Sequence, residues 1–318
     1  MATSYAPSIR RLGITLALAL ATLAAPNAGS AASYGWPLRP FDQQHPVRGF
    51  FGDPRIGESA DGHIESKTFH FGIDISAADG TAVYATASGR IVWEPQRPET
   101  IAIRGNDGVV FAYWHIIPAV RNGQTAVAYR TVLGRIAPGW GHVHLAELVG
   151  GRYVNPLRRG ALSPYADTTR PTIHTFSFER DGKAIDRTKL SGRFDLVAET
   201  WDETPLLVPG KWANKPVMPA VVRWRVHSGR GTSSAWRTAI DFSETIPAPG
   251  LFDTVYGRWT RQNHPWRSGR YRVRLALDWD SAAVNDGMHL LEVEAADTRG
   301  NRTKRSIRFE VTNEPHGS

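Results

Sequence analysis

Short segments in which apolar and polar residues alternate dominate this chain, and the clearest of them is residues 69–75. The apolar positions alternate there with polar or small ones in the order Phe69, His70, Phe71, Gly72, Ile73, Asp74 and Ile75. Because alternate side chains of a β-strand point to opposite faces, we predict one strand in which His70, Gly72 and Asp74 share a face. The four apolar side chains are then expected to face a core.

A second alternating segment, residues 141–145, places His142 and His144 on one face of another predicted strand. Two imidazoles and one carboxylate are a ligand set that suits zinc, and three protein ligands leave the fourth tetrahedral position for water. A single histidine in a strand is more often a hydrogen-bonded core or surface residue. The occurrence of two such segments makes a metal site an equally good interpretation.

The remaining segments of the first half are short, rich in β-forming residues and separated by turns. Strands are predicted at residues 81–85, 90–93, 100–104 and 109–114, and Asn106-Asp107-Gly108 is a strong hairpin signal. Helical periodicity is almost absent. We therefore expect an antiparallel β domain over residues 34–160, in which successive hairpins bring His70, Asp74 and His144 to one sheet face.

The second half repeats the β pattern after a polar, Pro-containing boundary at residues 157–171. Strands are predicted at residues 172–178, 193–200, 221–226, 271–277, 289–296 and 305–311. A tight hairpin at residues 297–301 resembles the corresponding hairpin of bacterial immunoglobulin-like or fibronectin-like domains. The predicted fold class is all-β, with an immunoglobulin-like β-sandwich over residues 168–314.

Seven tryptophans lie in this second half. We interpret them as core packing, and the alternative is a surface on which sugars or peptides stack. They are Trp201, Trp212, Trp224, Trp236, Trp259, Trp266 and Trp279. Residues 229–270 are long for one sandwich loop, so this segment is a candidate to reach the active site. Four histidines without matching partners are interpreted as structural or solvated: His174, His227, His264 and His289.

The first 32 residues have the order of a secretory signal peptide. Arg10 and Arg11 precede an apolar run at residues 12–25 and small residues at 28–32. The run is short for a bilayer span, so we predict no stable membrane span and a secreted or periplasmic protein.

The amino-acid composition limits which kinds of site and partner the chain can have. The 318 residues include no cysteine, which excludes disulfides and thiolate metal sites. A net charge of +8 favours an anionic partner, yet no dense Lys/Arg run or recognition helix appears, so nucleic acid is not expected.

Two further histidines are candidates for catalysis beside the predicted metal. Metal-assisted amide hydrolysis needs a base for the attacking water and a donor for the developing oxyanion. His142 and His115, which follows a predicted strand, can divide these tasks. His115 alone is also compatible with a hydrogen-bonded residue at a strand end.

Five elements in order resemble the LytM/lysostaphin-type zinc metallopeptidases, secreted endopeptidases that cut peptide crosslinks of bacterial cell walls. They are residues 52–55, the His-x-Gly-x-Asp element at 70–74, residues 80–92, Tyr113-Trp114-His115 and the His-x-His element at 142–144. The resemblance spans about residues 36–156. It implies an antiparallel β scaffold of the duplicated-hybrid-motif type.

Carried over residue by residue, the resemblance assigns His70, Asp74 and His144 as ligands of one Zn²⁺ per chain. His142 becomes the general base toward a metal-activated water and His115 the oxyanion donor, although the sequence does not separate these two roles. The implied substrate is peptidoglycan peptides. The scissile bond, an activating partner and the oligomeric state are not indicated.

The chain departs from the family pattern near the site. Leu145-Ala146-Glu147 stands where the family has an aromatic residue and then Glu, which places Glu147 on the opposite strand face. The loop at residues 135–141 is also unusual, and its Trp140 is equally well a groove wall or a buried anchor. These departures bear on groove shape, substrate choice and turnover rather than on the ligands.

Two other functions compete with hydrolysis. The altered loop before His142 suits a catalytically silent family member that binds the cell wall or activates an amidase. The tryptophan-rich second half suits an adhesin in which residues 168–318 alone carry binding.

Overall fold

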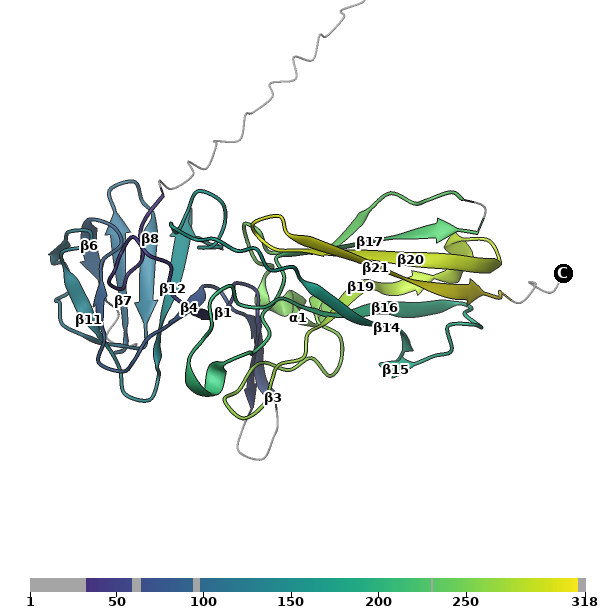
Figure 1. Cartoon of the computed structure of the whole chain (residues 1–318), viewed down its shortest axis with the longest axis horizontal. Helices are drawn as coiled ribbons and strands as arrows, with labels where there is room; N and C mark the ends of the chain where they lie inside the picture. The colour runs from purple at the N-terminus through teal and green to yellow at the C-terminus, as the bar shows by residue number, and fades with distance from the viewer. Residues whose placement is uncertain (1–32, 59–63, 94–97, 230, 314–318) are drawn as a thin grey trace, which may run out of the picture.

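The computed structural model describes residues 33–58, 64–93, 98–229 and 231–313, so the predicted signal peptide lies outside the described residues. The chain is nearly all β, as predicted, and each pair of strands within its sheets is antiparallel. Two units lie side by side along the long axis (Figure 1). We call strands β1–β13 the N-terminal unit and strands β14–β21 the C-terminal unit.

The N-terminal unit has an eight-stranded and a three-stranded sheet around one core. The large sheet has the order β1 (Val47–Gly49), β4 (Ile73–Ser76), β12 (His142–Val149), β8 (Val110–Trp114), β7 (Thr100–Gly105), β6 (Gly89–Val92) and β10 (Thr125–Ala126), with β13 (Arg152–Val154) also paired to β12. The small sheet has the order β5 (Ala82–Tyr84), β11 (Val132–Ile136) and β9 (Ile116–Pro118). Ile101 of the large sheet and Leu133 of the small one are both fully buried in this core.

The C-terminal unit is a sandwich of two four-stranded sheets. One has the order β15 (Lys183–Ala184), β14 (Thr172–Arg180), β16 (Arg193–Trp201) and β19 (Arg272–Asp280). The other has the order β18 (Arg237–Asp241), β17 (Val221–Ser228), β20 (Gly287–Ala296) and β21 (Arg302–Val311). Leu196 and Leu291, one from each sheet, meet in a shared core, and the predicted hairpin at residues 297–301 joins β20 to β21. The immunoglobulin-like assignment and the domain boundaries stay predictions.

Helical segments are short. They are η1 (Gly210–Trp212), η2 (Pro249–Leu251), α1 (Phe252–Val255) and η3 (Ser281–Ala283). Within the described residues, no helix has the length and apolar character needed to cross a bilayer.

Residues 69–75 do not form the single strand that the alternation predicts. β3 (Ile64–Phe69) pairs with β2 (Pro54–Glu58) in a separate two-stranded sheet, the chain turns at residues 70–72, and β4 begins at Ile73. Phe69 lies in the core of the C-terminal unit, whereas Ile73 and Ile75 lie in the core of the N-terminal unit. The apolar positions therefore divide between two cores.

Phe71 was also expected in a core and is instead half-buried. Its ring contacts Trp114 at 4.9 Å, His144 at 4.9 Å and Tyr153 at 4.6 Å between ring centroids. The turn that interrupts the strand removes Phe71 from the face shared by its neighbours.

Phe69 anchors the crossing between the units, so its truncation tests that crossing. Its ring lies 5.7 Å from Phe242, 5.5 Å from Phe252 and 5.8 Å from Tyr256. We expect Phe69→Ala to lower the free energy of unfolding by about 3–5 kcal/mol because it leaves a cavity in a packed core. Urea denaturation followed by circular dichroism measures this.

Ile64→Ala is the matched control in the same strand. Ile64 is 55% exposed, so its loss should change stability by less than about 0.5 kcal/mol. Equal effects of the two substitutions would show that Phe69 does not hold the units together.

Candidate metal centre

Two neighbouring strands and the turn before one of them position the predicted ligands. His144 of β12 lies directly opposite Asp74 of β4, and His142 lies opposite Ser76. His70 stands in the turn that precedes β4, four residues before Asp74. The strand pairing thus brings a carboxylate and an imidazole together although 70 residues separate them.

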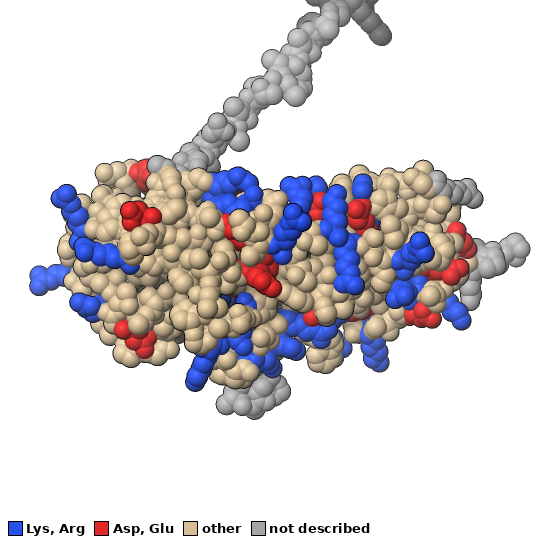
Figure 2. Space-filling view, viewed as in Figure 1, with Lys and Arg blue, Asp and Glu red and all other residues tan. Residues whose placement is uncertain are grey.

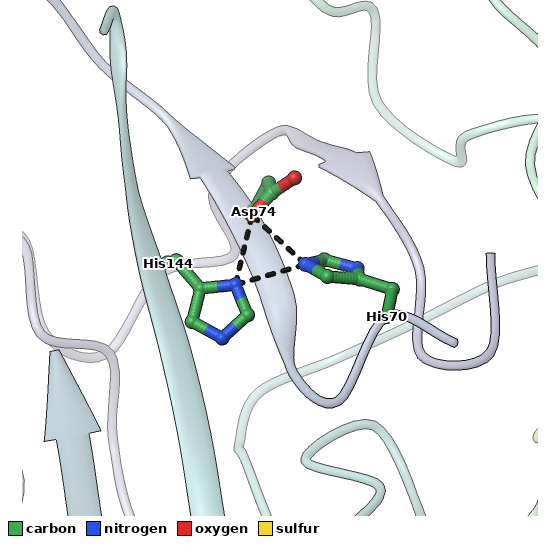
Figure 3. Close-up of side chains that lie close together, drawn as sticks. All are labelled: His70, Asp74 and His144. Carbon is green, nitrogen blue, oxygen red and sulfur yellow. Dashed lines mark hydrogen bonds and ion pairs between the residues drawn. The ribbon is translucent and has the colours of Figure 1, made fainter. Parts of the chain in front are cut away.

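The three side chains point toward one another (Figure 3). His70 Nε2 lies 2.8 Å from His144 Nδ1, and Asp74 Oδ1 lies 3.1 Å from each of these nitrogens. Three electron-pair donors that converge in this way repel one another unless a proton or a cation lies between them. Imidazole nitrogen and carboxylate oxygen are ligands that zinc prefers.

Hydrogen bonds to the far sides of His70 and Asp74 determine which of their atoms face the centre. His70 Nδ1 lies 2.9 Å from the carbonyl oxygen of Phe50, which places the ring proton on Nδ1 and leaves the lone pair of Nε2 facing the centre. Arg55 Nη2 donates to Asp74 Oδ2 at 2.8 Å, so Oδ1 remains for the centre. The donor set fits a metal ion.

Gly72 makes room for His144. A Cβ atom at Gly72 would lie 2.6 Å from His144 Nε2 and 2.4 Å from the carbonyl oxygen of Leu145. His144 Nε2 is buried and has no hydrogen-bond partner in the part of the chain that the structure describes. The imidazole is therefore held by close packing against the glycine.

Burial sets the protonation of the three residues. It lowers the pKa of His70 to about 3, with Arg55 adding to the effect, and it also lowers the pKa of His144. Burial alone would raise the pKa of Asp74, but His70, His142 and Arg55 outweigh it and hold this pKa well below its ordinary value. At neutral pH the residues thus have the states that metal binding requires, two neutral imidazoles and one carboxylate.

The two predicted catalytic histidines lie beside this centre. His142 Nε2 lies 3.4 Å from Asp74 Oδ1, and the rings of His142 and His115 are 4.7 Å apart. His115 follows the end of β8 with a φ of 67°, and its ring stacks on Trp140 at 3.6 Å. Burial, and then the neighbouring His142, lowers the pKa of His115 to about 3. All five residues singled out from the sequence therefore lie in one place.

A search of protein-family models supplies the family. Residues 68–156 match the model of peptidase family M23. This stretch is an M23 peptidase domain. The resemblance to LytM-type peptidases seen in the sequence is thereby confirmed, and the chain carries a metallopeptidase domain.

Other comparisons add little to this assignment. No curated protein matches the chain. A chain of the SpoIIIAH and SpoIIQ complex matches with 18% identity over 39% of this chain and 98% of that one, with a TM-score of 0.32. A zinc-containing peptidase from Vibrio cholerae matches with 20% identity over 41% of this chain and 40% of that one, with a TM-score of 0.32. The M23 metalloprotease pseudoalterin from the deep sea matches with 19% identity over 49% of this chain and 95% of that one, with a TM-score of 0.28.

Arg48 is a site residue that the sequence motifs of the M23 domain do not indicate. Its Nη2 lies 2.6 Å from His142 Nδ1, which also lies 2.8 Å from the carbonyl oxygen of Trp140. The guanidinium stacks 4.2 Å from the ring of Trp212, and burial lowers the pKa of Arg48 to about 10. Arg48 lies on β1, an edge strand that pairs with β4, and only this strand pairing brings it to the site.

Both units line the groove over the M23 centre, which has a cavity of about 420 Å³. The C-terminal unit contributes Trp212 and residues 262–265, so the long segment at 229–270 does reach the site, as predicted. Gln262 Oε1 anchors this segment by accepting a hydrogen bond from the backbone N–H of Ile56 at 2.7 Å. His264 is among the residues that line the groove.

The loop at residues 135–141 forms a wall of the groove. Asp79 accepts hydrogen bonds from the backbone N–H groups of Gly139 at 2.7 Å and Gly141 at 2.8 Å and so fixes the loop. Trp140 is 39% exposed and lines the cavity, which decides for a groove wall rather than a buried anchor.

Glu147 is fully buried away from the metal centre. It accepts hydrogen bonds from Arg158 Nη2 at 2.7 Å and from the hydroxyl of Tyr34 at 2.7 Å. The shift of this carboxylate to the opposite strand face, expected from the sequence, gives it a structural role.

A larger cavity of about 600 Å³ lies in the C-terminal unit, away from these residues. Glu199, Trp201 and Arg270 line it, and Glu199 pairs with Arg270 at 2.7 Å. The smaller groove is the better candidate because histidines with lowered pKa values and a convergent donor set meet there.

The lowered pKa of His115 predicts an acid-dependent loss of stability in the metal-free protein. The unfolded chain protonates this residue near pH 6.5, whereas the folded chain protonates it only near pH 3. Its contribution is fully present above pH 6.5 and falls as the pH falls through this window. Urea denaturation at pH 7.5 and at pH 5 should therefore show that wild type loses more unfolding free energy on acidification than His115→Asn does. The difference between their slopes of unfolding free energy against pH should correspond to at most one bound proton.

Asn suits this comparison because it tolerates a positive φ and does not titrate. Identical pH slopes for wild type and His115→Asn would contradict the buried neutral state of His115.

Proposed function

We propose that the chain is an exported zinc endopeptidase that hydrolyses peptide bonds in bacterial peptidoglycan. The observation that carries the proposal is the convergence of His70, Asp74 and His144 inside an M23 domain, with His142 and His115 beside them. The predicted secretory signal at residues 1–32 supports export.

His70 Nε2, Asp74 Oδ1 and His144 Nδ1 are proposed to hold one Zn²⁺ per chain. When bound, zinc supplies a Lewis acid and a water of lowered pKa at the substrate carbonyl. Three protein ligands leave access for the substrate, as in other catalytic zinc sites.

His142 is proposed as the general base, and its tautomer depends on its neighbours. A proton on Nδ1 donates to the carbonyl oxygen of Trp140 and leaves the lone pair of Nε2 free to accept a proton. A hydrogen bond from Arg48 to Nδ1 would instead place the ring proton on Nε2. The base role therefore requires the contact with Trp140, and Arg48 must yield when the base acts.

His115 is proposed to donate to the developing oxyanion. Stacking on Trp140 fixes the plane of its ring, so the donor is oriented before the reaction. Because its pKa is lowered, the neutral imidazole is the form present at neutral pH.

The groove suits an anionic peptide. Arg48 and Arg55 are cations beside the centre, and Trp114, Trp140 and Trp212 are aromatic walls. Figure 2 shows Lys and Arg side chains over both units, in keeping with the net charge of +8. Peptides that carry free carboxylates within a cell-wall polymer match this charge.

Cleavage of purified sacculi by the zinc-loaded chain tests the function. Wild type should bind one zinc per chain and release amine groups. His142→Ala should keep zinc but lose about 10²- to 10⁴-fold in rate because it removes the base. His144→Ala should lose both zinc and cleavage.

His227→Ala is the control, since His227 hydrogen-bonds Ser233 and Glu292 in the C-terminal unit, and it should retain both properties. Wild type that binds zinc and sacculi but never cleaves would sink the proposal and favour the silent wall-binding alternative. Mass analysis of the released muropeptides identifies the bond.

Gly72→Ala tests whether close packing of His144 supports the metal. The added methyl group displaces His144, so we expect zinc affinity to fall by about 10- to 100-fold, the range typical of lost support behind a ligand. Competition with a chromophoric chelator measures this affinity. Gly250→Ala, where an added Cβ meets no atom within 4 Å, should leave it unchanged.

A further inference from the structure

Three buried aspartates meet where the two units join. Asp167 lies in the connecting segment before β14, Asp202 directly follows β16, and Asp297 begins the hairpin between β20 and β21. One carboxylate oxygen from each lies within 4.8 Å of the others. The residues are only 7%, 1% and 8% exposed, respectively, so water does not screen their charges.

Backbone turns hold two of these carboxylates in place. Asp297 Oδ1 accepts from the N–H groups of Arg299 and Asn301, each at 2.8 Å. Asp167 Oδ1 accepts from the N–H of Thr169 at 2.9 Å. These carboxylates are fixed by local structure and cannot turn away from one another without breaking the turns.

Asp202 is held in a different way and has an unused oxygen. Its backbone forms two hydrogen bonds with Val217, at 2.7 and 2.9 Å, and its Oδ1 accepts from the N–H of Glu203 at 2.8 Å. Its Oδ2 is buried without a hydrogen-bond partner among the described residues. A buried carboxylate oxygen without a donor is costly, so a ligand is expected there.

No ion pair joins a cation of the described chain to the cluster. Arg299 is near enough to interact electrostatically with Asp167 and Asp297. Its Nε, however, donates to the carbonyl oxygen of Tyr165 at 3.1 Å and its Nη1 to that of Leu157 at 3.0 Å. Burial, followed by repulsion from Asp167 and Asp297, raises the pKa of Asp202 to about 8. Near neutral pH the cluster therefore takes up either a proton or a metal cation.

We propose that Asp167, Asp202 and Asp297 form a binding site for one Ca²⁺ ion, separate from the zinc centre. The donors are all carboxylate oxygens, which suit a hard cation rather than zinc. A cavity of about 10 Å³, lined by Asp202, Asp297, Phe50 and Asn155, adjoins the cluster and has room for about one water molecule. Water and further oxygens can complete the six to eight ligands that calcium takes.

The position of this site gives it a mechanical role. Asp167 belongs to the connection between the units, whereas Asp202 and Asp297 directly follow β16 and β20, which belong to opposite sheets of the sandwich. The adjoining cavity also touches Phe50, whose carbonyl oxygen hydrogen-bonds the predicted ligand His70. A bound ion thus ties the connection to both sheets next to the groove.

Calcium binding to the zinc-loaded full chain tests the site, with Ca²⁺ alone as the probe. Equilibrium dialysis should find one calcium per chain, and Tm should rise by several degrees when free Ca²⁺ is about 100 times its Kd. Asp202→Asn should lose both effects, because it replaces a charged ligand by a neutral isostere.

Two controls locate the effect. Asp186→Asn alters an exposed aspartate that likewise accepts a hydrogen bond in a turn, from the N–H of Thr188 at 2.9 Å, and this variant should retain calcium binding. His144→Ala should also retain it, which separates this site from the zinc centre.

Two results would overturn the proposal. One is wild type that binds no calcium together with Asp202→Asn that is at least as stable, which would show that a shared proton neutralises the cluster. The other is equal calcium binding by wild type and Asp202→Asn, which would place the ion elsewhere. Dialysis of wild type decides the first point even if the variant does not fold.

Discussion

The antiparallel pairing of β4 with β12 is the constraint on which the centre depends. It sets Asp74 opposite His144 and turns both side chains to the same face, so a shift of one residue in register would send one of them to the core. Ile73, Ile75, Val143 and Leu145 are completely buried behind the sheet, and their burial holds the register. The hydrophobic core of the N-terminal unit thereby fixes the polar geometry of the site.

The same chain segment joins this core to a second one. Phe69 is packed in the sandwich, and the next residue, His70, points to the centre, so the position of an expected ligand depends on both cores. Gln262 and Trp212 of the C-terminal unit close the groove from the other side. The sandwich is therefore part of the groove as well as an appended module.

Two buried polar clusters in this protein differ in how the negative charge of their carboxylates is balanced. At the M23 centre Arg55 offsets the charge of Asp74, the two imidazoles are neutral, and the donors are nitrogen and oxygen. At the junction three carboxylates meet with no ion pair to a cation in the described chain, and one oxygen lacks a donor. Because of this contrast in donor atoms, zinc suits the first cluster, whereas a hard cation such as calcium suits the second.

Local spacing in the sequence was enough to predict the all-β class and to single out five residues that the structure brings together. Strand alternation and the His-x-Gly-x-Asp and His-x-His elements act over only a few residues. The hairpins at residues 106–108 and 297–301 were predictable for the same reason. Only the tertiary structure decided that Phe69 and Ile73 belong to different cores, that Arg48 and Gln262 reach the groove, and that Asp167, Asp202 and Asp297 meet. Those contacts join residues far apart in the chain, and they depend on how sheets pack rather than on any local period.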